Sequence, residues 1–243
     1  MKIAYLTPTR ERSSRRRKFQ ESVVTTADNA DVVTFYYYID NDDPQLDTYL
    51  NQDIIGNRID HVDIPQSVSK GWNVIAQRAI DDGADVLMMG NDDLIQLTKG
   101  WDTILLKKIE EYPDPMYCFW FEDSINGNKH NAFPIVSKEW YNLLGYFTPG
   151  VFNFGYNDTW IYHVSMVAGK SHFIPEVVTK HEHFAAGHQV WDNTYARNRT
   201  SPINANAYGR DEIIFNSPES REKMQKDGQK IKEWLEKYEK SSL

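Results

Sequence analysis

Two neighbouring carboxylates follow a short apolar run in the first half of the chain. The run is Val86-Leu87-Met88-Met89, and after Gly90 it gives way to Asn91-Asp92-Asp93. Carboxylates at the end of a buried strand can hold a hard divalent cation, and that cation can in turn bind a diphosphate. The same residues also suit a turn or a helix cap, because Asp and Asn side chains hydrogen-bond readily to nearby backbone. A metal site and a turn are both compatible with this triplet.

Two histidines lie in a polar stretch of the second half. His181 and His183 flank Glu182 after an extended segment. Side chains alternate along an extended backbone, so both imidazoles should point to the same side. Neutral imidazole is a good ligand for transition metals, and the pair therefore predicts a metal-binding position. A structural or solvent-exposed role is the alternative for each histidine.

The bulk composition excludes several classes of protein. The chain has 243 residues, 40% of them hydrophobic, which is enough for one sizeable core. A net charge of -8 and a pI near 5.4 argue against a protein that binds nucleic-acid phosphates. The single Cys118 leaves no disulfide framework and no Cys-rich zinc site. No segment approaches the about 18 apolar residues of a membrane helix, so we expect a soluble, cytoplasmic protein that at most associates with a membrane surface.

The first half reads as two strand–helix–strand units. The runs Lys2 to Thr7 and Val32 to Ile39 are typical of buried strands, and Lys18 to Ala30 has the spacing of a helix between them. Trp72 to Ile80 has apolar residues at helical offsets and leads into the strand Val86 to Met89. Each predicted strand ends in polar, turn-forming residues. Open parallel sheets bind ligands at the carboxyl ends of their strands, so the pattern predicts a nucleotide-binding α/β layer.

The second half changes to a mixed pattern. An antiparallel strand pair is indicated by two apolar runs on either side of a polar turn. The expected elements are a helix at Trp101 to Glu111, the paired strands Tyr117 to Phe121 and Ala132 to Val136, helices at Lys138 to Leu144 and Asp158 to Ala168, and an extended stretch from His172 to Thr179.

The end of the chain predicts an amphipathic helix from Ser217, with apolar residues at Met224, Ile231, Trp234, Leu235 and Tyr238 on one face. The least patterned stretch, Gln189 to Asn216, suggests a loop over a site. We therefore expect one α/β domain over residues 1–216, divided into halves at about 111, and a terminal helix over 217–243.

Three short motifs, in this order, resemble those of the GT-A glycosyltransferases, in particular the family 2-like group. They are Thr7-Pro8-Thr9-Arg10, Asp40-Asn41-Asp42-Asp43-Pro44 and Asn91-Asp92-Asp93, and the resemblance covers about Lys2 to Phe184. It implies the GT-A fold, in which helices flank a Rossmann-like mixed sheet, and the metal-dependent transfer of a sugar from a nucleotide-sugar donor.

Carried over to this chain, the resemblance implies a donor pocket at the strand ends. Asp40 would accept a hydrogen bond from the base, and an imide N–H such as that of uracil suits a carboxylate, which cannot donate. The residues Arg15, Arg16 and Arg17 are expected to form a solvated basic segment. The implied nucleotide-binding residues are Pro8, Thr9, Arg10, Asp40, Lys70, Gly71, Asn73, Asn91 and Asp92.

The resemblance also implies the metal. Asp93 would bind Mn2+ or Mg2+ together with His181 or His183, and imidazole ligation favours manganese. Asn91 stands where the family has the first Asp of its DxD motif. An amide carbonyl can ligate a metal but adds no charge, so Asp92 and Asp93 would carry most of the binding.

The base that removes the acceptor proton is placed by the same resemblance at Asn157-Asp158, where the family has an acidic pair. Asp158 is the predicted base, and a helix N-cap is the alternative. Glu122-Asp123 is a competing acidic pair that would otherwise contact donor sugar or acceptor, as would Asn157. Trp120 and Trp191 are candidate acceptor contacts, although core packing is the commoner use of tryptophan.

The predicted function is a hexosyltransferase-type reaction from a UDP-sugar to an acceptor hydroxyl, with inversion. The acceptor is a glycan, lipid or protein that the sequence does not identify. A nucleotidyltransferase is the first alternative, but the chain lacks a glycine-rich phosphate loop after its first strand. A carbohydrate-binding protein without turnover is the second, because Asn91 and Asn157 replace acids.

Overall fold

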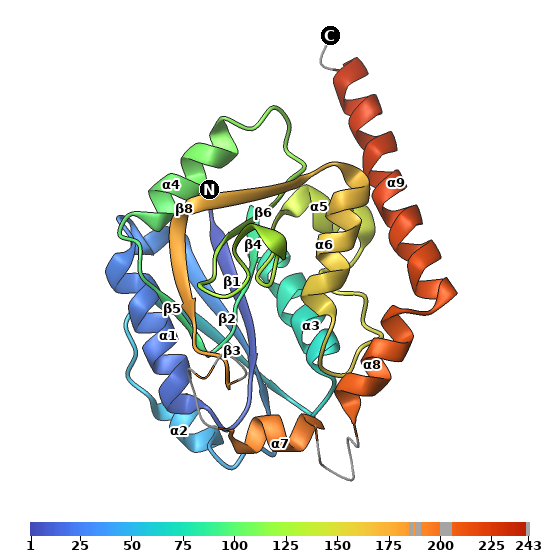
Figure 1. Ribbon diagram of the computed structural model, residues 1–243. Helices are drawn as coiled ribbons and strands as arrows, with labels where there is room; N and C mark the ends of the chain where they lie inside the picture. Colours follow the sequence, from blue (N-terminus) through green and yellow to red (C-terminus); the bar gives the residue numbers. More distant parts are fainter. Residues whose placement is uncertain (185–186, 188–190, 200–205, 242–243) are drawn as a thin grey trace.

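The computed structural model describes residues 1–184, 187, 191–199 and 206–241. Within this part of the chain, eight strands form one mixed sheet in the order β3-β2-β1-β4-β7-β6-β8-β5 (Figure 1). Strands β3, β2, β1 and β4 are mutually parallel, and β7 runs antiparallel to both β4 and β6. The strands are β1 (Ile3–Thr9), β2 (Val33–Asp40), β3 (Asn57–Asp63), β4 (Val86–Met89), β5 (Leu94–Gln96), β6 (Cys118–Glu122), β7 (Ile135–Ser137) and β8 (Ser171–His181).

Helices cover both faces of the sheet. Alternate residues of the central strands point to opposite faces, so each strand contributes to two cores. On one face Leu6 and Leu87 pack with α3, α5, α6 and α9, and on the other Tyr5 and Val86 pack with α1 and α4. The helices are α1 (Ser13–Thr26), α2 (Leu46–Asn51), α3 (Val68–Asp81), α4 (Trp101–Glu110), α5 (Lys138–Leu144), α6 (Asn157–Ala168), α7 (Asn193–Arg199), α8 (Ala207–Phe215) and α9 (Pro218–Ser241), with short 3-10 turns η1 (Ala30–Val32) and η2 (Gly127–Lys129).

The predicted α/β fold class is confirmed. The parallel register aligns Thr9 of β1 with Ile39 of β2, and Leu6 of β1 with Met89 of β4. The polar segments that follow these strands therefore meet at one edge of the sheet. The amphipathic terminal helix is also present as α9, which lies along α6 (Figure 1).

Three boundaries in the first strand–helix unit were predicted wrongly, including the end of the helix, which is Thr26 and not Ala30. β1 continues through Pro8 to Thr9, whereas the sequence suggested an end at Pro8. Its pairing with β4 stops at Leu6, so the missing N–H of Pro8 leaves no bond unmade on that side. The helix α1 begins at Ser13, not at Lys18, because the arginines that hide its apolar pattern are themselves helical.

The arginine segment is only partly solvated, contrary to expectation. Arg17 is half-exposed and pairs with Glu21 on the surface. Arg16 is fully buried, where it donates to Asp60 at 2.8 Å and lies over the ring of Tyr49. The long guanidinium side chain reaches from α1 back to the sheet, which charge patterning along the chain does not reveal.

Several elements were not predicted. β3 is a half-exposed edge strand without an apolar run, and β5 has only three residues. The loop prediction for Gln189 to Asn216 was wrong at α7 and α8; Gln189, Val190 and residues 200–205 lie outside the described residues. No helix in the described ranges is long and apolar enough to cross a membrane.

Candidate functional site

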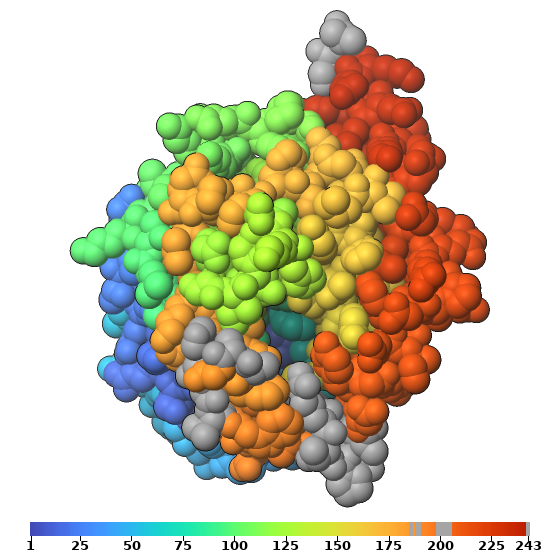
Figure 2. Space-filling view, in the orientation of Figure 1, coloured from blue at the N-terminus to red at the C-terminus, as the bar shows by residue number. Residues whose placement is uncertain are grey.

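A cavity of about 640 Å³ opens at the carboxyl ends of the parallel strands. Figure 2 shows the hollow between the β6–β7 loop, α6 and α8. Its walls come from both halves of the chain, and most of the predicted site residues are among them. Those that line the cavity are Pro8, Thr9, Arg10, Asp40, Gly71, Asn91, Asp92, Asn157, Asp158, His181 and His183.

The adjacent carboxylates of Asp92 and Asp93 have different partners. Asp92 lines the cavity and accepts hydrogen bonds from Thr9 Oγ1 at 2.8 Å and from Arg12 Nη1 at 2.9 Å. Burial, together with the charge of Asp93, raises the pKa of Asp92 in spite of Arg12. Asp93 is buried beside the cavity and accepts a hydrogen bond from the Tyr195 hydroxyl at 3.0 Å. Burial opposes its charge, but contacts with His181, Arg12 and Tyr195 outweigh burial and lower its pKa.

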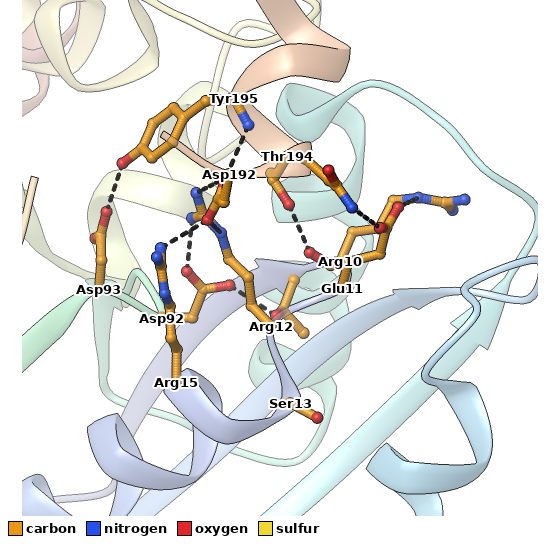
Figure 3. A network of polar contacts seen from close by, with 12 residues as sticks. Arg10, Glu11, Arg12, Ser13, Arg15, Asp92, Asp93, Asp192, Thr194 and Tyr195 are labelled. Atoms are coloured by element: carbon orange, nitrogen blue, oxygen red, sulfur yellow. Dashed lines mark hydrogen bonds and ion pairs between the residues drawn. The ribbon is translucent and has the colours of Figure 1, made fainter. Parts of the chain in front are cut away.

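The segment around α7 closes over this acidic pair (Figure 3). The guanidinium of Arg12 spans Asp92 and Asp192, which accepts from Arg12 Nε at 3.0 Å and from Nη2 at 3.1 Å. The guanidinium also lies 4.6 Å from the ring centre of Tyr195. Arg12 and Tyr195 were not predicted as site residues, because only tertiary contacts bring residues so far apart in the chain together.

Arg10 and Asp40 form a second charged group on the cavity wall. Arg10 Nη1 lies 2.8 Å from Asp40 Oδ2 and also contacts Asp42. Burial raises the pKa of Asp40, and the charges of Arg10 and Arg197 act in the opposite direction. Arg197 of α7 also lines the cavity, so this end of the cavity has two guanidinium groups near one half-buried carboxylate.

Asp158 lines the cavity from the first turn of α6. The N-cap of α6 is Tyr156, in a left-handed conformation with φ 64°, and not Asn157 or Asp158. Asp158 Oδ2 lies 3.1 Å from His130 Nε2, and both residues line the cavity. Asn157 is buried and donates to the carbonyl of Phe154, so its amide serves the loop.

A buried carboxylate on α8 holds the loop that precedes Asp158. Asp211 accepts hydrogen bonds from the backbone N–H groups of Asn153, Phe154 and Gly155, at 2.7 to 3.0 Å. Successive N–H groups that converge on one carboxylate fix the backbone between them. Asp211 therefore sets the position from which α6 begins, and no local sequence signal indicates it.

Several predicted residues lie away from the cavity. Lys70 is exposed on α3, and the Asn73 side chain bonds to the backbone of Phe147 and Thr148. Trp191 is half-exposed and packs against Phe184 and Tyr195. Three more side chains serve the β6–β7 loop or the core instead: Trp120 donates to Gly127, Glu122 accepts from the N–H of Ser124, and Asp123 accepts from the N–H groups of Ile125 and Asn126.

Asp93 and His181 are the predicted metal ligands that the structure brings closest together. Asp93 Oδ1 accepts no hydrogen bond within the described residues and faces His181 Nε2 at 3.5 Å. The ring of His183 is centred 5.0 Å from that of His181. No three His, Cys, Asp or Glu side chains in the described part form a group that could hold a metal by themselves. Asp93 and His181 offer a carboxylate and an imidazole, two groups that suit a transition metal. The other ligands of such a metal would have to come from a bound molecule or from solvent.

No protein-family model and no curated protein matches the sequence. Several solved structures, in contrast, are similar to this chain. S. aureus TarS 1–349 in complex with UDP-GlcNAc is similar with a TM-score of 0.63 at 12% identity, over 97% of this chain and 72% of that chain. A second TarS 1–349 structure is also similar, and there the match covers only 60% of the length of the TarS chain.

Two further structures are similar over most of both chains. The mannosyltransferase PcManGT from Pyrobaculum calidifontis, in complex with GDP-Man and Mn2+, has a TM-score of 0.55 at 10% identity, over 95% of this chain and 85% of its own. The catalytic domain of Drosophila β1,4-galactosyltransferase 7, in complex with xylobiose, has a TM-score of 0.50 at 17% identity, over 85% and 83%. The chain therefore has the fold of the GT-A-like glycosyltransferases.

Proposed function

We propose that the protein transfers a sugar from a nucleotide-sugar donor, a UDP-sugar, to a hydroxyl group of an acceptor. The observation that carries this proposal is that one cavity is lined both by Arg10 and Asp40, at the ends of the parallel strands, and by Asp158, at the start of α6. A nucleotide and an acceptor can thus approach each other within one site, which a transfer reaction requires.

The donor's nucleotide belongs at the Arg10 end of the cavity. Arg10 and Arg197 are permanent cations that favour a diphosphate, and Asp40 is an acceptor for the imide N–H of uracil. Pro8, Thr9, Gly71, Asn91 and Asp92 form the adjoining wall. Similar structures that hold UDP, UDP-GlcNAc or GDP-Man support a nucleotide-sugar as the donor class.

A divalent cation, Mn2+ in preference to Mg2+, is part of the proposal. Asp93 would hold it through Oδ1 and His181 through Nε2, with His183 close by. Bound there, the cation would neutralise the charge that develops on the departing nucleoside diphosphate. One similar structure, PcManGT, contains Mn2+.

Asp158 is the proposed base, which would accept the acceptor's proton. Its carboxylate lines the cavity at the start of a helix, where the loop held by Asp211 fixes the backbone. A base in the same cavity as the donor's nucleotide suits direct attack by the acceptor, which inverts the configuration at the anomeric carbon. A glycan, lipid or protein acceptor would enter the cavity next to Asp158. We propose that the reaction takes place in the cytoplasm.

A thermal-shift screen tests the donor assignment, because a ligand that binds only the folded state raises the apparent stability. UDP, GDP and UDP-GlcNAc are compared, each with and without Mn2+. We expect UDP ligands to stabilise the protein, Asp40→Ala to lose that stabilisation, and Asp47→Ala to keep it, because Asp47 is exposed on α2 and lies outside the cavity lining. A wild-type protein that no nucleotide stabilises would overturn the proposal.

Asp93→Asn and His181→Gln test the metal assignment. Both keep a polar side chain of similar size, so the fold should persist while the Mn2+-dependent part of the stabilisation disappears. Turnover is then measured as UDP release from UDP-sugars in the presence of mono- and disaccharide acceptors. Stabilisation by donor without any UDP release would instead indicate a binding protein.

A further inference from the structure

His130 and Asp158 form a pair on the cavity wall from two separate elements. His130 follows the turn η2 in the β6–β7 loop, and Asp158 is the second residue of α6. The distance from His130 Nε2 to Asp158 Oδ2 is 3.1 Å, and each side chain is a little over a quarter exposed. Both face the space in which the acceptor would bind.

The hydrogen bond fixes the tautomer of the neutral imidazole. An ionised carboxylate only accepts, so Nε2 must carry the proton and donate it to Asp158 Oδ2. The second oxygen of Asp158, Oδ1, has a single weak contact of 3.4 Å with Thr159 Oγ1 among the described residues. One oxygen is thus held by the histidine while the other remains available to a hydroxyl in the cavity.

The surroundings of His130 favour a charge on the ring. Burial lowers the pKa of His130, but the hydrogen bond and charge of Asp158, with the charge of Asp123, outweigh it and raise the pKa overall. The ring of Tyr162 on α6 packs edge-on against His130 at 5.4 Å. His163, the next residue on α6, has a pKa lowered by burial and by the charge of His130.

We propose that His130 positions the carboxylate of Asp158 and sets the lower pH limit of its action as the acceptor's base; this inference rests on the proposed function. Neutral His130 orients the carboxylate and leaves its charge intact. Protonated His130 pairs a full positive charge with the same carboxylate, and this ion pair opposes proton transfer from the acceptor. The group that changes its protonation state is thus the His130 ring, and the group affected is the Asp158 carboxylate.

The proposed transfer moves one proton and exchanges one bond at the anomeric carbon for another. The acceptor O–H bond breaks, its proton moves to Asp158 Oδ1, and the freed electron pair forms the new bond to the anomeric carbon. The bond from that carbon to the diphosphate oxygen breaks, and its electron pair leaves with the nucleoside diphosphate. The proton on His130 Nε2 stays on the ring throughout and remains hydrogen-bonded to Asp158 Oδ2.

The test is the pH profile of kcat, measured as UDP release from the UDP-sugar that stabilises the protein most, for wild type, His130→Gln and His130→Ala. Gln can still donate to Asp158 but cannot be protonated. We expect it to keep kcat within about threefold at pH 8 and to move the acid limb at least about one pH unit lower. His130→Ala should lose kcat by about 10- to 100-fold at pH 8, where the wild-type ring is neutral, with KM for the donor unchanged.

The control is His172→Gln, an exposed histidine beside Tyr112 and outside the cavity, which should keep the wild-type profile. An unchanged acid limb in His130→Gln, or a wild-type kcat in His130→Ala, would overturn the inference and leave the proposed function standing. A loss of about 100-fold or more in His130→Gln at pH 8 would also overturn it, because the histidine itself would then take the proton. A wild-type protein that releases no UDP contradicts the proposed function, and this inference with it.

Discussion

Arg12 and Asp92 form an ion pair of 2.9 Å in which both side chains are buried. The same guanidinium contacts Asp192, which directly precedes α7, so one arginine connects the end of β4 to the segment that closes over it. Burial of two charges is tolerated because each is paired and hydrogen-bonded. Removal of either side chain leaves the charge of the other buried without an opposite charge beside it.

Arg12→Ala should therefore destabilise the protein by about 3 to 5 kcal/mol. Arg17→Ala removes an exposed pair with Glu21 four residues away, and should cost no more than about 0.5 kcal/mol. The free energy of unfolding in urea measures both. Equal effects of the two substitutions would contradict the importance of the buried pair.

Asp211→Ala should lower stability on the order of 3 kcal/mol, because three backbone N–H groups lose a charged acceptor. The loop before Asp158 would shift, while the donor end of the cavity stays intact. We expect UDP-dependent thermal stabilisation to persist and UDP release to fall. Asp47→Ala, at an exposed position of α2, is the matched control.

Gly228 allows α9 to cross α6 closely. A Cβ at this position would lie 2.4 Å from Val167 Cγ1 and 3.1 Å from the carbonyl oxygen of Val164. Gly228→Leu gains about 1 kcal/mol in helix propensity, but overpacking should cost about 3 kcal/mol or more. The melting temperature should fall, whereas Gln229→Leu, on the exposed side of α9, should leave it nearly unchanged.

His130 and His172 should affect the pH dependence of stability in opposite directions. The pKa of His130 is raised on folding, so its contribution is fully present below the unfolded pKa of about 6.5 and is lost as pH rises through the folded pKa. The pKa of His172 is lowered, first by burial, so folding loses stability as pH falls. In urea titrations at about pH 5.5 and 8.5, His130→Gln should cost more at the lower pH, and His172→Gln should be relatively favourable there. The same trend for both variants would contradict these assignments.

The part of the cavity wall at the ends of the parallel strands was largely predictable from the sequence. Thr9, Arg10, Asp40 and Asn91 each follow or end a strand whose apolar run is readable from the residues alone. Parallel strands bring their carboxyl ends to one edge, so local patterns and one rule of topology were enough to bring these residues together.

Only the tertiary structure decided the rest. His130, Tyr195 and Asp211 lie in a loop, in a short helix and in a helix without a strong apolar face, so their neighbourhood carries no periodic signal. Their roles depend on contacts across 28, 102 and 56 to 58 residues, with Asp158, with Asp93 and with the loop at 153–155. Conversely, Asn73 and Trp120 have suitable chemistry but point to structural partners. The sequence by itself determined the strands β1, β2 and β4 and the edge of the sheet at which they end, because strand periodicity is local. Which of the remaining polar side chains face the cavity was decided by packing between distant segments.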